Sequence, residues 1–286
     1  MTSIAYLGPQ GTYSQTCAEA YSKLAGISGA KLVPYNTIWQ VIQAVAQGNT
    51  DLAIAPVENS IQGSVAITLD GLWQWDRLQI QQAIILPIDH SLITYAQSLA
   101  EIQVVYSHPQ GLGQCQQWLE RNLPHAQQVP LDSTTHGLQL VKAQERTAAI
   151  ASHHAAGIYH LPVLVRHISD YPENYTRFWV LGVTPPRHNG STTSWGFSFS
   201  QNRAGTLARA LNTLAHRQIN LSRIESRPSK RSLGEYIFFV DIDGAMGDAQ
   251  VRSAWQELSQ MTESLKHFGS YDLVHLDTQS AEFLAG

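Results

Sequence analysis

The sequence predicts an α/β protein of two domains, of which the second is a ferredoxin-like βαββαβ module. Three observations predict this class. Short apolar runs alternate with helical patterns in the first part of the chain, a stretch with two prolines and a glycine interrupts them near residue 188, and the order of strands and helices changes after it. The length of 286 residues, about twice the ~150 residues of one average domain, agrees with this division.

In the first domain, residues 1–184, each apolar run is followed by a turn signal and a helical pattern. Strands are predicted at 4–7, 52–55, 104–106, 148–151 and 178–183, and helices at 14–24, 38–47, 112–123 and 135–143. Parallel strands need crossover connections, which are usually helices. The alternation therefore predicts a mainly parallel sheet.

The second domain follows a predicted linker at residues 185–190, which is rich in proline, glycine and polar residues. Residues 191–278 are predicted to contain strands at 193–200, 219–226, 236–242 and 271–276, with helices at 205–216 and 249–265. This order is the βαββαβ order of ferredoxin-like domains. Residues 279–286 are expected to form a C-terminal tail.

The composition excludes several classes of protein. A net charge of -4 is unlike that of a nucleic-acid-binding protein, and no apolar run approaches the roughly 18 residues of a membrane span. The N-terminus lacks the basic and apolar regions of a secretory signal. Cys17 and Cys115 are far apart, have no metal-binding spacing and are expected to be buried thiols. We therefore expect a cytoplasmic protein without a metal site.

Polar groups gather at three strand-to-helix junctions of the first domain. The first junction is Gly8-Pro-Gln-Gly-Thr-Tyr-Ser14, where Thr12 and Ser14 offer hydroxyl groups at a helix N-terminus. Free N–H groups and the helix dipole favour a carboxylate or phosphate there. The pattern is neither GxGxxG nor a P-loop, which disfavours nucleotides.

The second junction is Pro56-Val-Glu-Asn-Ser-Ile-Gln-Gly63, at the carboxyl end of a predicted strand. Ligands of open α/β sheets bind at such ends, so Glu58, Asn59 and Ser60 are candidate ligand groups, although Asn-Ser is also a common turn.

The third junction is Ser107-His-Pro-Gln-Gly-Leu-Gly-Gln-Cys115. Ser107 is a candidate helix cap, and the spacing of Gln110 and Gln114 places both on one helix face. We interpret His108 as a structural hydrogen-bond donor rather than a catalytic base.

A further polar cluster, Asn174-Tyr-Thr-Arg-Phe178, precedes the last strand of the first domain. Arg177 is one of only eight Lys and Arg in this domain, against twelve Asp and Glu. Its guanidinium group could hold a carboxylate through two hydrogen bonds, or it could simply be solvated. Thr176 is a candidate proton donor, and Phe178 would exclude water.

Together the motifs at 8–14, 56–65, 107–115 and 174–178 resemble the prephenate dehydratase family, and the βαββαβ module resembles an ACT regulatory domain. The resemblance implies a periplasmic-binding-protein-like catalytic domain, formed by two α/β lobes around a cleft. It implies a carbon–oxygen lyase (hydro-lyase) that converts prephenate to phenylpyruvate, with loss of carbon dioxide and water, in L-phenylalanine biosynthesis. This reaction needs neither a metal nor an organic cofactor.

The resemblance also implies residue roles by motif position. The implied catalytic residues are Thr176, Glu58, Asn59, Ser107 and Gln114, and the implied substrate-binding residues are Thr12, Tyr13, Ser14, Arg177 and Phe178. Thr176 is expected to act through positioned hydrogen bonding or a proton relay, because a hydroxyl group is a weak acid. Glu58 is the alternative acid if burial raises its pKa.

The ACT-like domain is expected to bind L-phenylalanine as a feedback effector, at an interface within a homodimer or homotetramer. The implied effector residues are Gly205, Thr206, Leu207, Asn220, Leu221, Ser222, Glu225 and Ser226. Ala204 and Thr206 depart from the usual Pro-Gly-Ala-Leu pattern, which leaves the identity of the effector and the sign of the response open. We interpret the basic residues Arg223, Arg227, Lys230 and Arg231 as a solvated strand and hairpin rather than a site for an anionic partner.

Two alternative functions stay open. Arogenate dehydratase acts on a substrate with an amino group in place of the side-chain ketone. A non-catalytic amino-acid-sensing protein would keep the cleft and the C-terminal module but lose the acid, and the presence of Thr176, Arg177 and Glu58 disfavours it.

Overall fold

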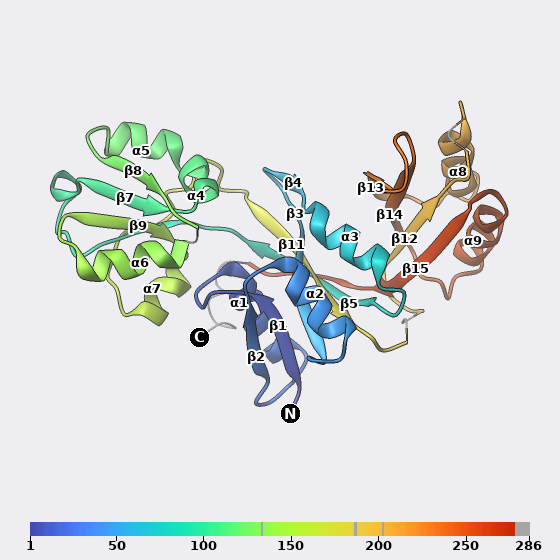
Figure 1. Ribbon diagram of the computed structural model, residues 1–286, viewed down its shortest axis with the longest axis horizontal. Helices are drawn as coiled ribbons and strands as arrows, with labels where there is room; N and C mark the ends of the chain where they lie inside the picture. Colours follow the sequence, from blue (N-terminus) through green and yellow to red (C-terminus); the bar gives the residue numbers. More distant parts are fainter. Residues whose placement is uncertain (133, 186–187, 202, 278–286) are drawn as a thin grey trace.

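The computed structural model describes residues 1–132, 134–185, 188–201 and 203–277, and the predicted tail at 279–286 lies outside these residues. The chain forms three sheets, and Figure 1 shows the three α/β units side by side along the long axis of the molecule. Two units are the lobes of the first domain, and the third is the C-terminal domain. The α/β class, the two lobes and the C-terminal βαββαβ domain are thus confirmed.

Lobe 1 contains a seven-stranded sheet in the order β16-β5-β11-β3-β1-β2, with β4 paired to β3. Its strands are β1 (Ser3–Leu7), β2 (Lys31–Tyr35), β3 (Leu52–Asn59), β4 (Gly63–Ser64), β5 (Gln79–Pro87), β11 (Tyr175–Gly182) and β16 (Leu273–His275). Its helices are α1 (Tyr13–Leu24), α2 (Ile38–Ala46) and α3 (Ala66–Gln74). Thr12 and Thr37 cap α1 and α2 with their side chains.

The direction of β11 brings residues of two predicted motifs together. The strands β1, β2 and β3 are parallel, but β11 is antiparallel to both β3 and β5, so the prediction of a mainly parallel sheet is wrong for this part of the lobe. Because β11 runs opposite to β3, its first residues pair with the last residues of β3. Thr176 therefore faces Asn59, and Arg177 faces Glu58.

Lobe 2 contains a five-stranded sheet in the order β10-β6-β9-β7-β8, with a parallel centre and antiparallel strands on one side. Its strands are β6 (Ser91–Ile93), β7 (Val104–Ser107), β8 (Gln127–Pro130), β9 (Thr147–Ala151) and β10 (Val163–Val165). Its helices are the 3₁₀ turn Leu99–Glu101, α4 (Pro109–Gln114), α5 (Gln116–Asn122), α6 (Thr134–Ala143) and α7 (His153–Tyr159).

One helix prediction in lobe 2 is wrong. The predicted helix 112–123 is two helices, which meet at Cys115. The carboxylate of Asp170 accepts hydrogen bonds from the backbone N–H groups of Gln117 and Trp118, both at 2.9 Å. It thereby caps the second helix, α5, from a position more than fifty residues away along the chain, which local sequence patterns do not reveal.

The C-terminal domain has the predicted βαββαβ order. It contains β12 (Thr192–Ser198), α8 (Thr206–Ala215), β13 (Leu221–Pro228), β14 (Tyr236–Asp243), α9 (Ala249–Met261) and β15 (Ser264–Tyr271), with an antiparallel sheet in the order β13-β14-β12-β15. The predicted last strand, 271–276, differs from the structure. The last strand of this domain is β15, and residues Leu273–His275 return to lobe 1 as β16, parallel to β5.

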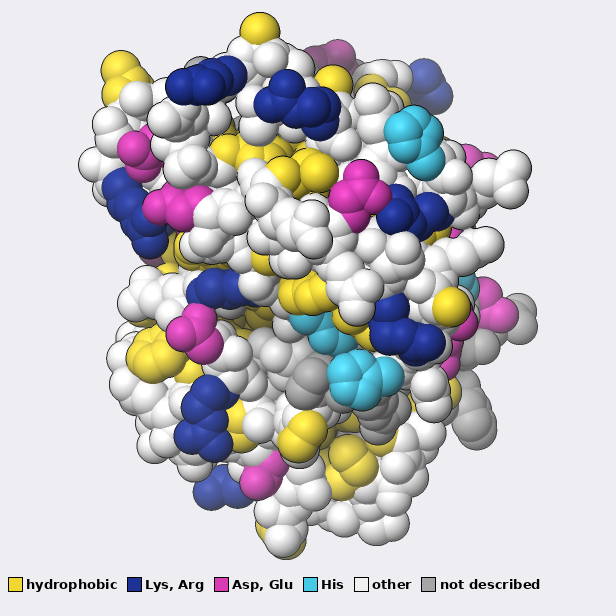
Figure 2. Space-filling view, turned by 90° about the vertical axis from the view of Figure 1, so that its right-hand side faces the viewer, with side chains coloured by type: hydrophobic (Ala, Val, Ile, Leu, Met, Phe, Trp, Pro, Cys, Tyr) yellow, Lys and Arg dark blue, Asp and Glu magenta, His cyan; other side chains and the backbone are white. Residues whose placement is uncertain are grey.

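The C-terminal sheet lies between two hydrophobic clusters. One face packs on α8 and α9, and the other face contributes Ile237, Phe239 and Phe268 to a cluster that also contains Trp179 and Leu72 of lobe 1. Lobe 1 and the C-terminal domain therefore share one core. On the outer side of this domain, Figure 2 shows basic and acidic side chains interspersed.

The basic residues of β13 and the following hairpin are not simply solvated, which corrects our interpretation. Arg227 and Lys230 form ion pairs with Asp70 of α3, at 3.3 Å and 2.7 Å. Although burial opposes it, hydrogen bonds from Lys230 and Arg227 lower the pKa of Asp70. These residues attach the C-terminal domain to lobe 1.

Both cysteines are buried free thiols, and none of the helices in the described ranges combines the length and apolar content needed to cross a membrane.

Candidate active site

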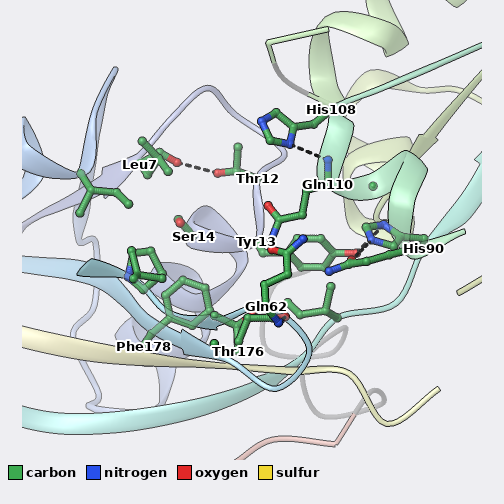
Figure 3. Close-up of a pocket in the computed structure, with 18 of the residues that line it drawn as sticks. Leu7, Thr12, Tyr13, Ser14, Gln62, His90, His108, Gln110, Thr176 and Phe178 are labelled. Atoms are coloured by element: carbon green, nitrogen blue, oxygen red, sulfur yellow. Dashed lines mark hydrogen bonds between the residues drawn. The ribbon is translucent and has the colours of Figure 1, made fainter. Parts of the chain in front are cut away.

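A cavity of about 540 Å³ lies between the two lobes. Seven of the implied site residues line it: Thr12, Tyr13, Ser14, Asn59, Gln114, Thr176 and Phe178. Figure 3 shows Thr12, Ser14 and Phe178 on one side of the cavity and Gln110 and His90 on the other. Four sequence motifs therefore meet at this cavity: those that follow β1 and β3, the one that opens β11 and the one at α4.

Asn59 and Thr176, both buried, meet across the neighbouring strands β3 and β11. Asn59 Nδ2 donates hydrogen bonds to Thr176 Oγ1 at 3.0 Å and to Asn174 Oδ1 at 2.8 Å. The orientation of the Asn59 amide is fixed, because its Oδ1 accepts from the backbone N–H groups of Ile61 and Gln62, both at 3.1 Å. Thr176 Oγ1 is thus an acceptor from Asn59. No described residue accepts the hydroxyl proton of Thr176, which is available to a molecule in the cavity.

The N-terminus of α1 provides neutral donors on the lobe 1 side. Thr12 caps the helix, and its own hydroxyl group donates to the carbonyl of Leu7 at 2.8 Å, so this hydroxyl proton is already used. Ser14 is buried at the cavity, and no described residue forms a hydrogen bond with its Oγ. Ser14 Oγ and the first-turn N–H groups of this twelve-residue helix can therefore bind a carboxylate group.

His90, which the sequence interpretation did not include, lines the cavity and contacts Gln114 and Tyr13. Its Nε2 is 2.8 Å from Gln114 Oε1, and its Nδ1 is 3.3 Å from the hydroxyl group of Tyr13. Burial lowers the pKa of His90, although Gln114 and Asp89 oppose this effect. A neutral His90 that donates from Nε2 uses the Gln114 oxygen and leaves the Gln114 NH₂ group for a ligand. Burial also raises the pKa of Tyr13, whose hydroxyl donates to the Asp89 carbonyl at 2.5 Å.

The two lobes also meet directly at the mouth of the cavity. Gln62, in the turn between β3 and β4, accepts a hydrogen bond from Nε2 of Gln110 in α4. The lobes also touch at Gly11 of lobe 1 (φ +86°), which packs so closely on lobe 2 that a Cβ atom there would lie 3.0 Å from Thr135 and 3.1 Å from Ala155.

Glu58 and Arg177 lie on the opposite face of the lobe 1 sheet, and neither lines the cavity. Successive residues of a strand point to opposite faces, so both must point away when their neighbours Asn59 and Thr176 point in. Arg177 Nη1 is 3.0 Å from Asp241 Oδ2 of the C-terminal domain and 4.0 Å from Glu58 Oε2. In this structure Arg177 therefore holds a carboxylate of the chain itself, contrary to the expectation that it faces a substrate carboxylate.

Ser107 is also not at the cavity. It is completely buried, and its hydroxyl group donates to the carbonyl of Ile150 at 2.8 Å, which links β7 to β9. The helix cap at this junction is His108 instead, whose Nδ1 accepts from the backbone N–H of Gln110 at 3.2 Å. His108 lines the cavity.

The charge of the cavity follows from these placements. Among the described residues that line it there is no Lys or Arg, and Asp132 is the one carboxylate. An anionic ligand would therefore be bound by hydroxyl groups, amides and helix N-termini. The low basic content of the first domain predicts neutral donors. Asp132 and His90 carry no local sequence signal, because each lies in the short connection that follows a strand.

The implied effector residues form two short segments on the C-terminal domain. Gly205 (φ +79°) caps α8, and Thr206 and Leu207 form its first turn. Asn220 precedes β13, and Leu221, Ser222, Glu225 and Ser226 lie on that strand. Gly205, Asn220, Ser222 and Ser226 are exposed, whereas Glu225 faces lobe 1 and accepts a hydrogen bond from Ser64 Oγ at 2.9 Å.

Comparisons with known proteins agree with this arrangement. The family model "Prephenate dehydratase" matches residues 4–186, and the model "ACT domain" matches residues 197–260. A bifunctional chorismate mutase/prephenate dehydratase from Aquifex aeolicus is 37% identical, over 94% of this chain and 73% of that protein. A prephenate dehydratase from Amycolatopsis methanolica is 36% identical, over 95% of this chain and 88% of that protein.

A solved structure agrees as well. The prephenate dehydratase from Arthrobacter aurescens, solved in complex with L-Phe, superimposes with a TM-score of 0.84 at 31% identity, over 95% of this chain and 90% of that chain. The match of the family model to more than half of the chain, the relatives that span nearly all of it and the shared fold lead to one conclusion: the chain belongs to the prephenate dehydratase family and carries an ACT domain after its catalytic domain.

Proposed function

We propose that this protein is a hydro-lyase that converts prephenate to phenylpyruvate, carbon dioxide and water in L-phenylalanine biosynthesis. The observation that carries the proposal is the pair Asn59 and Thr176 at the wall of the interlobe cavity, with the hydroxyl proton of Thr176 free to face a ligand. A non-catalytic sensor has no need of a hydroxyl group oriented in this way.

The chemistry requires one proton for each turnover. The bond between the ring and its carboxylate breaks, the electron pair moves through the ring, and the ring C–O bond breaks as the leaving oxygen gains a proton. Prephenate dianion and one proton thus give phenylpyruvate anion, carbon dioxide and water. The driving force comes from decarboxylation and aromatisation, so the protein must mainly orient the substrate and assist the leaving group.

Thr176 assists the leaving hydroxyl group in this proposal. Its O–H donates a hydrogen bond to the leaving oxygen, while Asn59 Nδ2 donates to Thr176 Oγ1 and stabilises the partial negative charge that develops there. Because a threonine alkoxide is too basic to persist at neutral pH, a proton from solvent must replace the one that Thr176 passes to the leaving oxygen. Glu58 does not supply the proton, because it lies on the other face of the sheet.

The two substrate carboxylates are bound by neutral groups. Ser14 and the N-terminus of α1 serve one carboxylate from lobe 1, and the NH₂ group of Gln114, oriented by His90, serves the other from lobe 2. Phe178 packs on the ring and excludes water from it. Separation of the donors between two lobes favours a closed cleft around the substrate.

Arogenate remains the second candidate substrate because of Asp132. This carboxylate at the cavity could pair with the ammonium group of arogenate, whereas it would repel the dianion of prephenate. Asp132 is exposed, so water weakens this repulsion, and prephenate stays the preferred proposal.

L-Phenylalanine is the proposed feedback effector at the ACT domain. The exposed start of α8 and the exposed residues of β13 support a site that a second copy of the chain completes, in a homodimer or homotetramer. The two buried free thiols support function in the reducing cytoplasm.

Phenylpyruvate formation tests the proposed function. The purified protein is incubated with prephenate and, in parallel, with arogenate, and products are measured as phenylpyruvate and phenylalanine. The proposal expects phenylpyruvate with a kcat/KM for prephenate at least ten times that for arogenate. Turnover of neither substrate would reject it, and a preference for arogenate would replace it with arogenate dehydratase.

A further inference from the structure

The strand ends that carry Asn59 and Thr176 have a second face, which touches the ACT domain. Asn59 and Thr176 point into the cavity, while the adjacent Glu58 and Arg177 point toward β13 and β14. Contacts that fix Glu58 and Arg177 therefore also fix the backbone of their neighbours Asn59 and Thr176, whose side chains line the cavity.

Asp241 of β14 is the partner that fixes Arg177. Its side chain is 1% exposed, its Oδ2 accepts from Arg177 Nη1 at 3.0 Å, and its Oδ1 accepts from Ser194 Oγ at 2.5 Å. Ser194 is itself hydrogen-bonded to the hydroxyl group of Tyr271 at 2.6 Å. A carboxylate with both oxygens occupied in a buried site holds its guanidinium partner in one position.

Glu225 of β13 holds the other strand end. Its Oε2 accepts a hydrogen bond from Oγ of Ser64, and Ser64 pairs with Glu58 in the short β3–β4 hairpin. The turn of this hairpin contains Gln62, which bridges to lobe 2 at the mouth of the cavity. Glu225 thus holds a hairpin in which Asn59 pairs with Gly63 directly before the turn, and the turn itself carries the contact with lobe 2.

Arg223 lies between these two contacts and is held less tightly. Its Nε is 3.7 Å from Glu58 Oε2 and its Nη1 is 3.8 Å from Asp241 Oδ2, and both nitrogens are buried without a hydrogen bond to any described residue. Buried guanidinium donors without partners are unfavourable. Arg223 Nη2 donates to Ser64 Oγ at 3.4 Å, so Arg223 contacts the same hydroxyl group that Glu225 holds.

We propose that Asp241 and Glu225 of the ACT domain are positioning residues for the reaction: Asp241 acts through Arg177 on Thr176, and Glu225 acts through Ser64 on Asn59. The ACT domain then contributes to catalysis even without an effector. Because Glu225 lies in a segment implied in effector binding, the same contacts give an effector a direct route to the active site. The inference rests on the proposed function.

The first test uses Glu225, which is only half-buried, and measures turnover of prephenate without any amino acid present. Glu225→Ala removes the acceptor for Ser64, whereas Glu225→Gln keeps an oxygen that can accept the same hydrogen bond. Glu257→Gln is the matched control, because it removes a carboxylate from the Arg217–Glu257 ion pair on the far side of the same domain. We expect kcat to fall about tenfold in Glu225→Ala, with KM changed less than threefold, and to recover in Glu225→Gln. Equal basal kcat in wild type and Glu225→Ala would overturn the role of Glu225.

The second test is a double-mutant cycle between Asp241 and Thr176. Asp241→Asn should lower kcat about tenfold in the wild-type background. In a Thr176→Val background it should have no further effect on the residual rate, because the group on which Asp241 acts is gone. Equal reductions in both backgrounds would overturn the role of Asp241. A wild-type protein that does not convert prephenate would instead reject the proposed function, so the two failures are distinguishable.

Discussion

Asn59 Nδ2 donates to Thr176 Oγ1 at 3.0 Å, across two strands whose sequence positions are more than a hundred residues apart. The bond depends on the antiparallel direction of β11, which places the first residues of that strand beside the last residues of β3. It makes the Thr176 oxygen an acceptor from the protein and leaves the Thr176 proton for a ligand. The proposed reaction mechanism follows from this relationship.

Asn59→Asp tests the donor in this pair. The aspartate keeps an oxygen for the N–H groups of Ile61 and Gln62, so the turn should form, but it loses the Nδ2 donor and adds a negative charge beside Thr176. We expect kcat to fall about 100-fold, as for loss of one oriented donor, with an unchanged circular dichroism spectrum. A folded variant with kcat within threefold of wild type would contradict the proposed role.

His90 is expected to act on substrate binding through Gln114. His90→Leu leaves Gln114 Oε1 without its donor, so the amide can rotate and the NH₂ group is no longer directed at the substrate. The loss of one such hydrogen bond, about 1.4 kcal/mol, corresponds to a roughly tenfold higher KM. His90→Gln, which can again donate to Gln114, should restore part of the affinity. Equal KM values in the two variants would show that the contact with Gln114 is not what matters.

Asp132→Asn separates the two candidate substrates. Removal of this negative charge should lower KM for prephenate about two- to threefold, because the dianion is no longer repelled across water. It should not improve arogenate, whose ammonium group loses a partner. Steady-state kinetics with both substrates measures the change. A higher KM for prephenate in Asp132→Asn would mean that Asp132 assists binding rather than opposing it.

The lowered pKa of His267 makes the free energy of unfolding depend on pH. Burial, together with His188, lowers the pKa of His267 to about 4. Between its ordinary value near 6.5 and pH 4, the unfolded chain therefore binds a proton that the folded chain does not, and stability falls as pH falls. In His267→Phe, which keeps a ring against Trp255, this contribution is absent. The unfolding free energy of wild type relative to this variant should fall by about 2 kcal/mol from pH 7 to pH 4, after allowance for solvent contact. Denaturant titrations that give a constant difference would contradict the prediction.

Local patterns were sufficient to predict the α/β class, the C-terminal βαββαβ order and most of the strands and helices. They were not sufficient for the direction of β11, which depends on its neighbours in the sheet. The division of the predicted helix 112–123 depends on Asp170, and the return of Leu273–His275 to lobe 1 depends on the edge strand β5. Each of these features is decided by a contact between residues far apart in sequence.

The candidate site shows the same limit. Asn59, Ser14, Gln114 and Thr176 line one cavity, because each of their motifs ends or begins a strand at the cleft. Side chains alternate between the two faces of a strand, so Glu58 and Arg177, the neighbours of Asn59 and Thr176, lie on the opposite face of the sheet. A sequence motif alone does not show which of its residues face the cavity. The role of His90 follows only from its contact with Gln114, which the sequence does not reveal.

The role of the Thr176 hydroxyl group is tested most directly by the kcat of three proteins with prephenate: wild type, Thr176→Ser and Thr176→Val. Thr176→Ser keeps a hydroxyl group that Asn59 can orient, whereas Thr176→Val keeps the shape of the side chain and removes the hydroxyl. We expect Thr176→Ser to retain kcat within about tenfold of wild type, and Thr176→Val to lose a factor of about 10² to 10⁴. A folded Thr176→Val variant that converts prephenate to phenylpyruvate at nearly the wild-type rate would contradict this role.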